Sequence, residues 1–142
     1  MNRFPTRKKD EIITFPYVFS GLEFGAVDLE SRNLNIRYDL PDSIWQRVTD
    51  LYEKLPGWYG YGRDGRGEEG IPYWFSYDKS QKSISASVEP SGLQFTAYNL
   101  DREEWEAWLS QFKELATVEL GFHVGEIELG EVGYEIEWLE GP

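Results

Sequence analysis

The sequence predicts an α+β domain, a mainly antiparallel sheet with two amphipathic helices packed on it, in the order βββαβββαββ. Two observations indicate this class. Several short stretches alternate apolar with polar residues, which is the period of a strand, and two longer stretches repeat apolar residues at helical spacing. The chain of 142 residues is 40% hydrophobic and 16% aromatic, which is enough apolar material for one core. We therefore expect a single domain over residues 1–142.

Three strands are predicted before the first helix, over residues 12–19, 22–29 and 34–40. In the third, Leu34, Ile36 and Tyr38 alternate with polar residues, as expected of a half-buried strand. Residues 30–33, Glu-Ser-Arg-Asn, suit a hairpin turn between the second and third strands. We therefore expect the first forty residues to form strands and turns.

The first helix is predicted over residues 42–55. Its apolar side chains recur every three or four residues, at Ile44, Trp45, Val48, Leu51, Tyr52 and Leu55. Pro41 suits the first turn, and Pro56-Gly57 ends the helix.

Three further strands are predicted over residues 72–77, 83–88 and 93–98. Ile84, Ala86 and Val88 alternate with serines in the middle strand. Residues 78–81 and 89–92 have turn composition, and Pro90 and Gly92 supply the backbone angles that such a turn needs. We expect an antiparallel meander.

A second helix is predicted to begin at Asn99 or Asp101 and to end at Gly121. Asp101 and Glu104 have the spacing of a capping box, and a glycine is the usual residue after a helix. The apolar stripe of this helix consists of Trp105, Trp108, Leu109, Phe112, Leu115 and Ala116.

Residues 122–139 predict two more strands around a turn at 129–131. Tyr134, Ile136 and Trp138 alternate with glutamates, so we expect the rings to be buried and the opposite side to be a row of carboxylates. The carboxylates predicted to form this acidic, partner-binding face are Glu126, Glu128, Glu135 and Glu137.

The negative charge is concentrated in the last third of the chain. The net charge is −12, and residues 101–142 hold twelve acidic against two basic residues, a balance of −10. Such a surface repels nucleic-acid phosphates and anionic lipids and attracts a basic protein. We therefore expect neither direct nucleic-acid binding nor membrane binding. The alternative is that the charge serves only solubility.

The stretch 57–70 combines six glycines with aromatic and charged residues. Gly60 to Gly65 spell G-x-G-x-x-G, but they follow a helix and not a strand, so we expect a flexible loop without a nucleotide site. Large rings on loops are frequent binding anchors. The residues expected to contact a partner here are Trp58, Tyr59, Tyr61, Asp64, Glu68 and Glu69. In the alternative interpretation, Trp58 and Tyr59 fold back as a lid on the core.

The sequence offers few groups for catalysis or metal binding. It has no Cys, and its one histidine, His123, is not accompanied by a nucleophile motif. Zinc and iron ligands are lacking, and no acidic loop has calcium-binding spacing. We therefore expect no catalytic residue, no metal and no cofactor. An enzyme whose carboxylates share a pocket that the sequence does not reveal is a further alternative.

Three stretches carry a resemblance to a known group of proteins: WYGYGRDGRGEEGIPYWF, SVEPSGLQF and EWEAWLSQFKELATVELGFHVGEIE. In these and in its acidity the chain resembles the immunity proteins that bacteria encode beside polymorphic or contact-dependent growth-inhibition toxins. The resemblance extends over most of the chain and carries over no individual residue. It implies a small cytoplasmic toxin inhibitor that neutralises a cognate toxin, such as a nuclease, by stoichiometric binding.

A small-ligand or carbohydrate-binding domain is the alternative from another class. Its rings would be those of Trp58, Tyr59, Tyr61 and Trp74. Against it, Tyr73, Phe75 and Tyr77 share one face of a predicted strand, a pattern more typical of a core.

Overall fold

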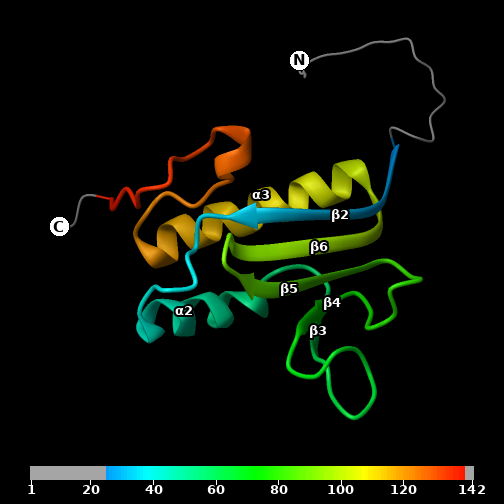
Figure 1. Ribbon diagram of the computed structural model, residues 1–142. Helices are drawn as coiled ribbons and strands as arrows, with labels where there is room; N and C mark the ends of the chain where they lie inside the picture. The colour runs from blue at the N-terminus through cyan, green and yellow to red at the C-terminus, as the bar shows by residue number, and fades with distance from the viewer. Residues whose placement is uncertain (1–24, 140–142) are drawn as a thin grey trace, which may run out of the picture.

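The computed structural model describes residues 25–139 and confirms the α+β class. Five strands form one antiparallel sheet in the spatial order β2-β6-β5-β4-β3 (Figure 1). The elements are β2 (Ala26–Leu34), α2 (Asp42–Tyr52), β3 (Trp58–Tyr61), β4 (Pro72–Trp74), β5 (Ser83–Glu89), β6 (Gly92–Asp101), α3 (Arg102–Leu120) and the short 3₁₀ helix η1 (Ile127–Leu129). The strand predicted over residues 12–19 lies outside the described residues. Neither helix of the described chain is long and apolar enough to span a membrane.

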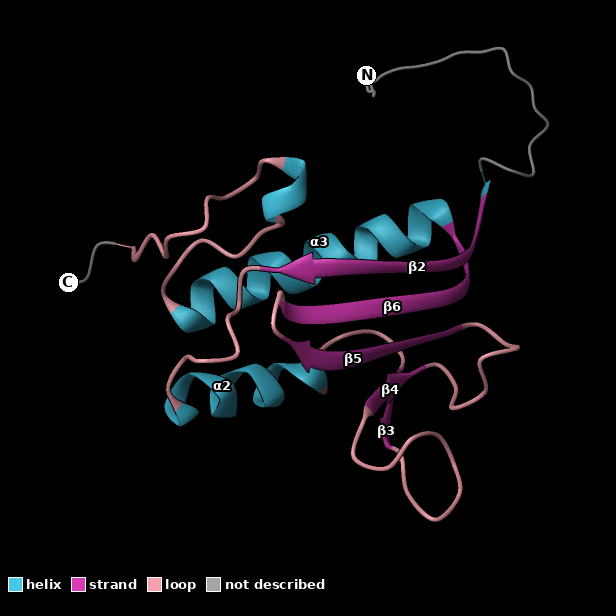
Figure 2. Cartoon of the chain, in the orientation of Figure 1, coloured by secondary structure: helices cyan, strands magenta, loops and turns pink. Residues whose placement is uncertain are grey.

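Both helices pack on the same face of the sheet, and α3 runs behind β2 and β6 in Figure 2. Trp74 of β4 marks the centre of this core and is fully buried. Its ring meets Tyr52 of α2 and Trp108 of α3 edge-on, each with centroids 5.1 Å apart. Its indole Nε1 donates a hydrogen bond to the Tyr52 carbonyl at 3.0 Å. Each edge-on pair contributes about 0.5–1.5 kcal/mol beyond the area it buries, so Trp74 joins the sheet to both helices.

The two predicted helices are confirmed. Helix α2 ends at Tyr52, slightly before the predicted end. The carboxylate of Asp101 caps α3 by accepting the backbone N–H groups of Glu103 and Glu104. Gly121 ends it in the left-handed region, at φ 83°. The Glu104 side chain pairs with Lys82 at 2.6 Å and so serves to attach the first turn of α3 to the end of β5.

The predicted meander is confirmed with changed strand lengths. Strands β5 and β6 pair from Ser83 opposite Tyr98 to Glu89 opposite Gly92. Strand β4 is shorter than predicted because Phe75 has a φ of 75°, which ends the extended backbone. Strand β6 is longer than predicted and continues to Asp101.

One continuous strand, β2, passes through the hairpin turn that was predicted at residues 30–33, so that prediction is wrong. Polar residues of this stretch have partners on other elements. Ser31 Oγ lies 2.8 Å from Thr96 Oγ1 on β6, and the Arg32 guanidinium binds Glu106 and Glu126. Because these partners are 65 to 94 residues away in sequence, local turn propensity could not indicate them.

The strand predicted over residues 34–40 ends at its first residue, Leu34. Ile36 is buried, and its carbonyl accepts the N–H of Leu93 at 3.1 Å. Further along, the Leu40 N–H donates to the Arg37 carbonyl at 3.2 Å, so the chain turns there. The predicted alternation therefore fails at Tyr38, whose side chain is exposed.

The two strands predicted over residues 122–139 are absent. This part of the chain forms η1 and an irregular extended path, with one isolated bridge between Phe122 and Trp138. Tyr134 and Trp138, which the alternation placed in the core, are 66% and 58% exposed. Of the three alternating apolar residues, Ile136 alone is partly buried against the core.

The glycine-rich stretch contains paired strands and a tight turn, where a loop was predicted. Strand β3 pairs with β4, and beyond it Arg63 and Arg66 form an antiparallel bridge. Asp64 and Gly65 between them have φ values of 55° and 83°, the pair of positive values that a two-residue type I′ turn requires. The Asp-Gly pair was therefore the turn signal in this stretch.

Candidate functional site

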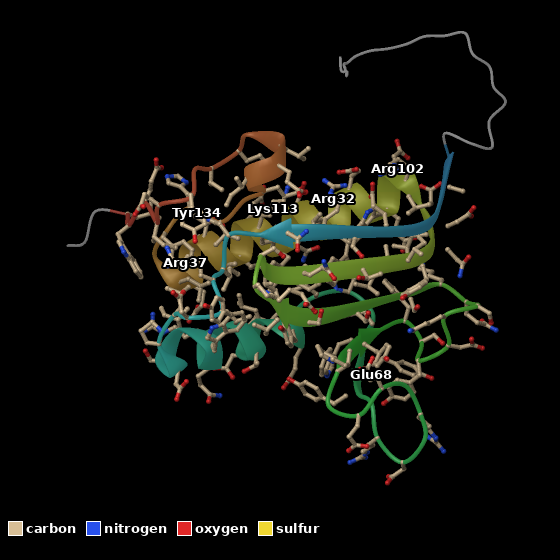
Figure 3. The ribbon with its side chains drawn as sticks, viewed as in Figure 1. Arg32, Arg37, Glu68, Arg102, Lys113 and Tyr134 are labelled. Carbon is tan, nitrogen blue, oxygen red and sulfur yellow. The ribbon has the colours of Figure 1, made fainter. Side chains whose placement is uncertain are left out.

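The residues predicted to contact a partner fall into two widely separated regions, marked by Glu68 and Tyr134 in Figure 3. We call residues 58–74 the hairpin and residues 122–139 the C-terminal segment. The hairpin carries Trp58, Tyr59, Tyr61, Asp64, Glu68 and Glu69, and the C-terminal segment carries Glu126, Glu128, Glu135 and Glu137. A partner that touched both regions would have to extend across the sheet.

The rings of the hairpin divide into a buried and an exposed group. Trp58 is half-buried, lying 5.3 Å from Trp74 and 6.1 Å from Tyr52 between ring centroids, which is the lid position of the alternative interpretation. Tyr59 and Tyr61 are 54% and 41% exposed. Trp74 is inaccessible, so it could not stack on a ligand.

The acidic residues of the hairpin lie at its projecting end. Asp64, Glu68 and Glu69 are all exposed. The backbone there is fixed by the phenol of Tyr73, which accepts the Glu68 N–H at 2.8 Å. The backbone at Glu68 is therefore held in place although the stretch has little apolar content.

Glu126 is buried, which corrects the prediction of an exposed carboxylate. The Arg32 guanidinium donates to both of its oxygens, with Nε and Nη2 each at 2.8 Å, and Lys113 Nζ is a further donor. Burial alone would raise the pKa of Glu126, but the hydrogen bonds from Arg32 and Lys113 outweigh it and hold that pKa below its ordinary value. Glu126 is thus an internal anchor for the C-terminal segment.

The same ion network continues along the edge of β2. Arg32 also donates two hydrogen bonds to the Glu106 carboxylate, from Nη1 at 2.7 Å and from Nη2 at 3.2 Å. Arg102 Nη1 lies 3.2 Å from the same carboxylate. Burial works to raise the pKa of Glu106, and the bonds from Arg32 and Arg102 lower it below its ordinary value. A shallow depression of about 390 Å³ opens here. Arg32 and Arg102 line this depression together with Glu106 and Glu126. The carboxylates of Glu106 and Glu126 are therefore already paired with cations.

Asn35 is a second anchor of the C-terminal segment that the sequence did not reveal. It is 3% exposed, and its backbone N–H donates to the Gly125 carbonyl at 3.0 Å. Its side chain accepts the Gly125 N–H and donates to the His123 carbonyl, both at 2.9 Å. The only local signal was a polar residue between two buried ones, Leu34 and Ile36.

Beyond these anchors the C-terminal segment carries many exposed apolar and acidic residues. Five of the eleven large apolar side chains that are exposed among the described residues lie within residues 127–139, so almost half of them come from this short segment. We call this set the C-terminal patch: Ile127, Leu129, Tyr134, Trp138 and Leu139, with Glu128, Glu135 and Glu137.

The patch is fixed from beneath and charged at its surface. Trp138 packs edge-on against the buried ring of Phe122 with centroids 5.2 Å apart, and Arg37 lies 5.1 Å from the ring centroid of Tyr134. No cation of the described chain lies at ion-pair distance from the carboxylates of Glu128, Glu135 or Glu137. Three of the four C-terminal glutamates predicted to bind a partner therefore have no ion pair with residues 25–139.

Comparison with known proteins identifies no relative, since no protein-family model, curated protein or solved structure matches the chain. Among residues 25–139, no group of three or more histidine, aspartate or glutamate side chains is placed to hold a metal ion. The backbone carbonyl of His123 accepts a hydrogen bond from the Asn35 side chain, and the His123 side chain is exposed. The chemistry that the C-terminal patch offers is apolar contact area beside unpaired hydrogen-bond acceptors.

Proposed function

We propose that the protein is an immunity protein that binds and neutralises a cognate bacterial toxin through the C-terminal patch. The observation that carries this proposal is that residues 127–139 combine exposed rings with carboxylates that have no ion pair within residues 25–139. Tyr134 and Trp138 would be the anchors, because large rings bury much area and lose few rotamers on binding.

The charge of the patch selects the partner. A basic protein is attracted over a distance of about 10 Å at moderate salt, and this attraction raises the rate of encounter. Nucleases present basic surfaces to the phosphates of their substrates, so we propose a nuclease toxin as the partner and the cytoplasm as the place of binding.

The buried anchors support a binding role because they pre-organise the patch. Asn35 and Glu126 fix the backbone at residues 123–126, directly before the exposed run. A surface that is already ordered loses less conformational entropy when it binds, and this increases the affinity.

The test is coexpression with the product of the adjacent gene. We expect the chain to rescue growth of cells that express that gene and to elute with its product as a complex of defined stoichiometry in size-exclusion chromatography. If the purified proteins form no complex and the chain gives no rescue, the proposal is overturned.

A charge-reversal pair then locates the interface. Glu135→Lys with Glu137→Lys should slow association at low salt about tenfold, because both carboxylates belong to the patch. The matched control is Asp50→Lys with Glu53→Lys, which makes the same charge change at exposed positions at the end of α2. Equal rates for both double variants would assign the attraction to net charge and remove the patch from the proposal.

Binding of a carbohydrate or another small ligand is a second candidate, favoured by the exposed rings of Tyr59 and Tyr61. The ring of Tyr61 lies 5.3 Å from that of Trp58, so a sugar stacked on Tyr61 should alter the fluorescence of Trp58. Titration with a glycan panel tests this candidate, with Tyr61→Ala as the control. An unchanged emission spectrum with every glycan would exclude it.

A further inference from the structure

The tip of the hairpin brings two arginines directly opposite each other. Arg63 N–H donates to the Arg66 carbonyl at 2.9 Å, and Arg66 N–H donates to the Arg63 carbonyl at 3.0 Å. Residues that exchange both backbone bonds across an antiparallel pair project their side chains on the same side of the ribbon, with Cβ atoms about 5 Å apart. Both arginines are exposed.

The two guanidinium groups have no counter-ion in the described chain. Neither forms an ion pair or a side-chain hydrogen bond with residues 25–139. Arg32, Arg37 and Arg102, in contrast, all pair with carboxylates. Within residues 25–139, Arg63 and Arg66 thus face each other without an ion pair, although the protein has 26 acidic residues and a net charge of −12.

The arginine pair opposes the formation of the hairpin. Like charges directly opposite each other on two strands are destabilising. The turn itself depends on Asp64 and Gly65, which supply the positive φ values, and does not need arginine on either side. Folding of the tip therefore places two guanidinium groups side by side without a directly bound carboxylate among the described residues, and an anion bound between them would relieve their mutual repulsion.

We infer that Arg63 and Arg66 form a binding site for a single oxyanion, namely a side-chain carboxylate of a protein partner. Each guanidinium is a planar fork of N–H donors that matches a carboxylate. A nucleic acid fits less well, because the neighbouring carboxylates of Asp64, Glu68 and Glu69 would repel successive phosphates. The exposed rings of Tyr59 and Tyr61 on the same hairpin add apolar contact area. This site does not depend on the partner proposed for the C-terminal patch.

The binding test follows the arginine side-chain Nε–Hε signals by NMR in the full chain at about 10 mM salt, where screening is weak. The probes are a blocked Gly-Glu-Gly peptide, which carries one carboxylate, and a single-stranded thymidine oligonucleotide. We expect saturable shifts of Arg63 and Arg66 with the peptide at a Kd of about 1–10 mM. Arg66→Thr should weaken this binding about tenfold, and Arg47→Thr, at an exposed cation on α2, should leave it unchanged. Absence of peptide shifts, or tighter binding to the oligonucleotide, overturns the inference.

A stability measurement distinguishes a binding site from a structural pair. Arg66→Thr removes the repulsion and places a good strand former in the ribbon, so the Tm should rise by about 1–4 °C while peptide binding weakens about tenfold. A fall in Tm would mean that the two arginines stabilise the fold, and the inference would then be wrong.

Discussion

The hairpin and the C-terminal segment are both rich in glycine, aromatic rings and charge, but they are held in opposite ways. The hairpin is held by backbone pairing of β3 with β4 and by the rings packed on Trp74. The C-terminal segment makes only one isolated bridge among the described residues, between Phe122 and Trp138, and depends on Asn35 and on the Arg32–Glu126 pair. Regular pairing directs Trp58 inward, whereas side-chain anchors leave Tyr134 and Trp138 at the surface.

This difference determines how each region responds to substitution. The hairpin is held by many small backbone contacts, so it should be displaced only when Trp74, which attaches it to the core, is removed. A segment held mainly by polar side-chain contacts should loosen when a central one of them, that of Asn35 or Glu126, is removed.

Removal of Trp74, which attaches the hairpin to the core, should have the largest effect on stability. Trp74→Ala removes a fully buried indole that contacts both helices, so the free energy of unfolding should fall by about 3–5 kcal/mol. Urea denaturation measures it. Tyr59→Ala is the control in the same hairpin and should cost less than about 1 kcal/mol, because that ring is exposed. Similar losses for the two variants would show that the hairpin does not depend on Trp74.

Removal of the charged anchor of the C-terminal segment should be nearly as costly. Glu126→Ala leaves Lys113 and one side of Arg32 without a buried partner, and the expected loss is about 3 kcal/mol. Glu128→Ala, two residues away at an exposed position without an ion pair among the described residues, should change stability by no more than about 0.5 kcal/mol. Equal effects would contradict the assignment of Glu126 as an anchor.

The neutral anchor should show the contrast most directly. Asn35→Ala leaves the Gly125 N–H and the His123 carbonyl without their partner, at an expected cost of about 2 kcal/mol. Hydrogen exchange should reveal a loss of protection of about thirtyfold at the Gly125 amide, with little change at the Arg66 amide of the hairpin. Equal loss at both amides would indicate global unfolding and no separate C-terminal unit.

The pH dependence should be the smallest effect. Glu126 and Glu106 have pKa values held below the ordinary 4.5 in the folded protein. Their stabilisation is therefore fully present above about pH 4.5 and is lost as the pH falls through the lowered values. Urea unfolding from about pH 6 to about pH 3 should show a smaller loss for Glu126→Gln than for the parent chain. Identical losses would remove Glu126 from the acid response.

The helices and the β5–β6 pair could be predicted because their signals are local. Apolar residues at helical spacing mark α2 and α3, Asp101 and Gly121 mark the ends of α3, and alternation marks β5 and β6. The hairpin contained a local signal as well, the Asp64-Gly65 pair, but the many glycines around it indicated a loop.

The candidate site was less accessible to sequence reasoning because its structure depends on distant partners. Alternation at Tyr134, Ile136 and Trp138 indicates a strand only if another strand lies beside it, and in the described chain no strand of the sheet pairs with this stretch. The burial of Glu126 depends on Arg32, which is 94 residues away in sequence. The acidic character of the site was therefore predictable, whereas its exposed rings and buried anchors were not.

The hydrogen bonds between Asn35 and Gly125 also determine when the C-terminal patch can form. Asn35 and Gly125 are 90 residues apart, so a ribosome adds the second partner on the order of ten seconds after the first. Closing so large a loop is entropically costly and is favourable only after the sheet has brought its ends together. The pairing of β3 with β4 joins residues near in sequence and can form early, whereas the contacts of Asn35 with Gly125 must wait for the C-terminal segment.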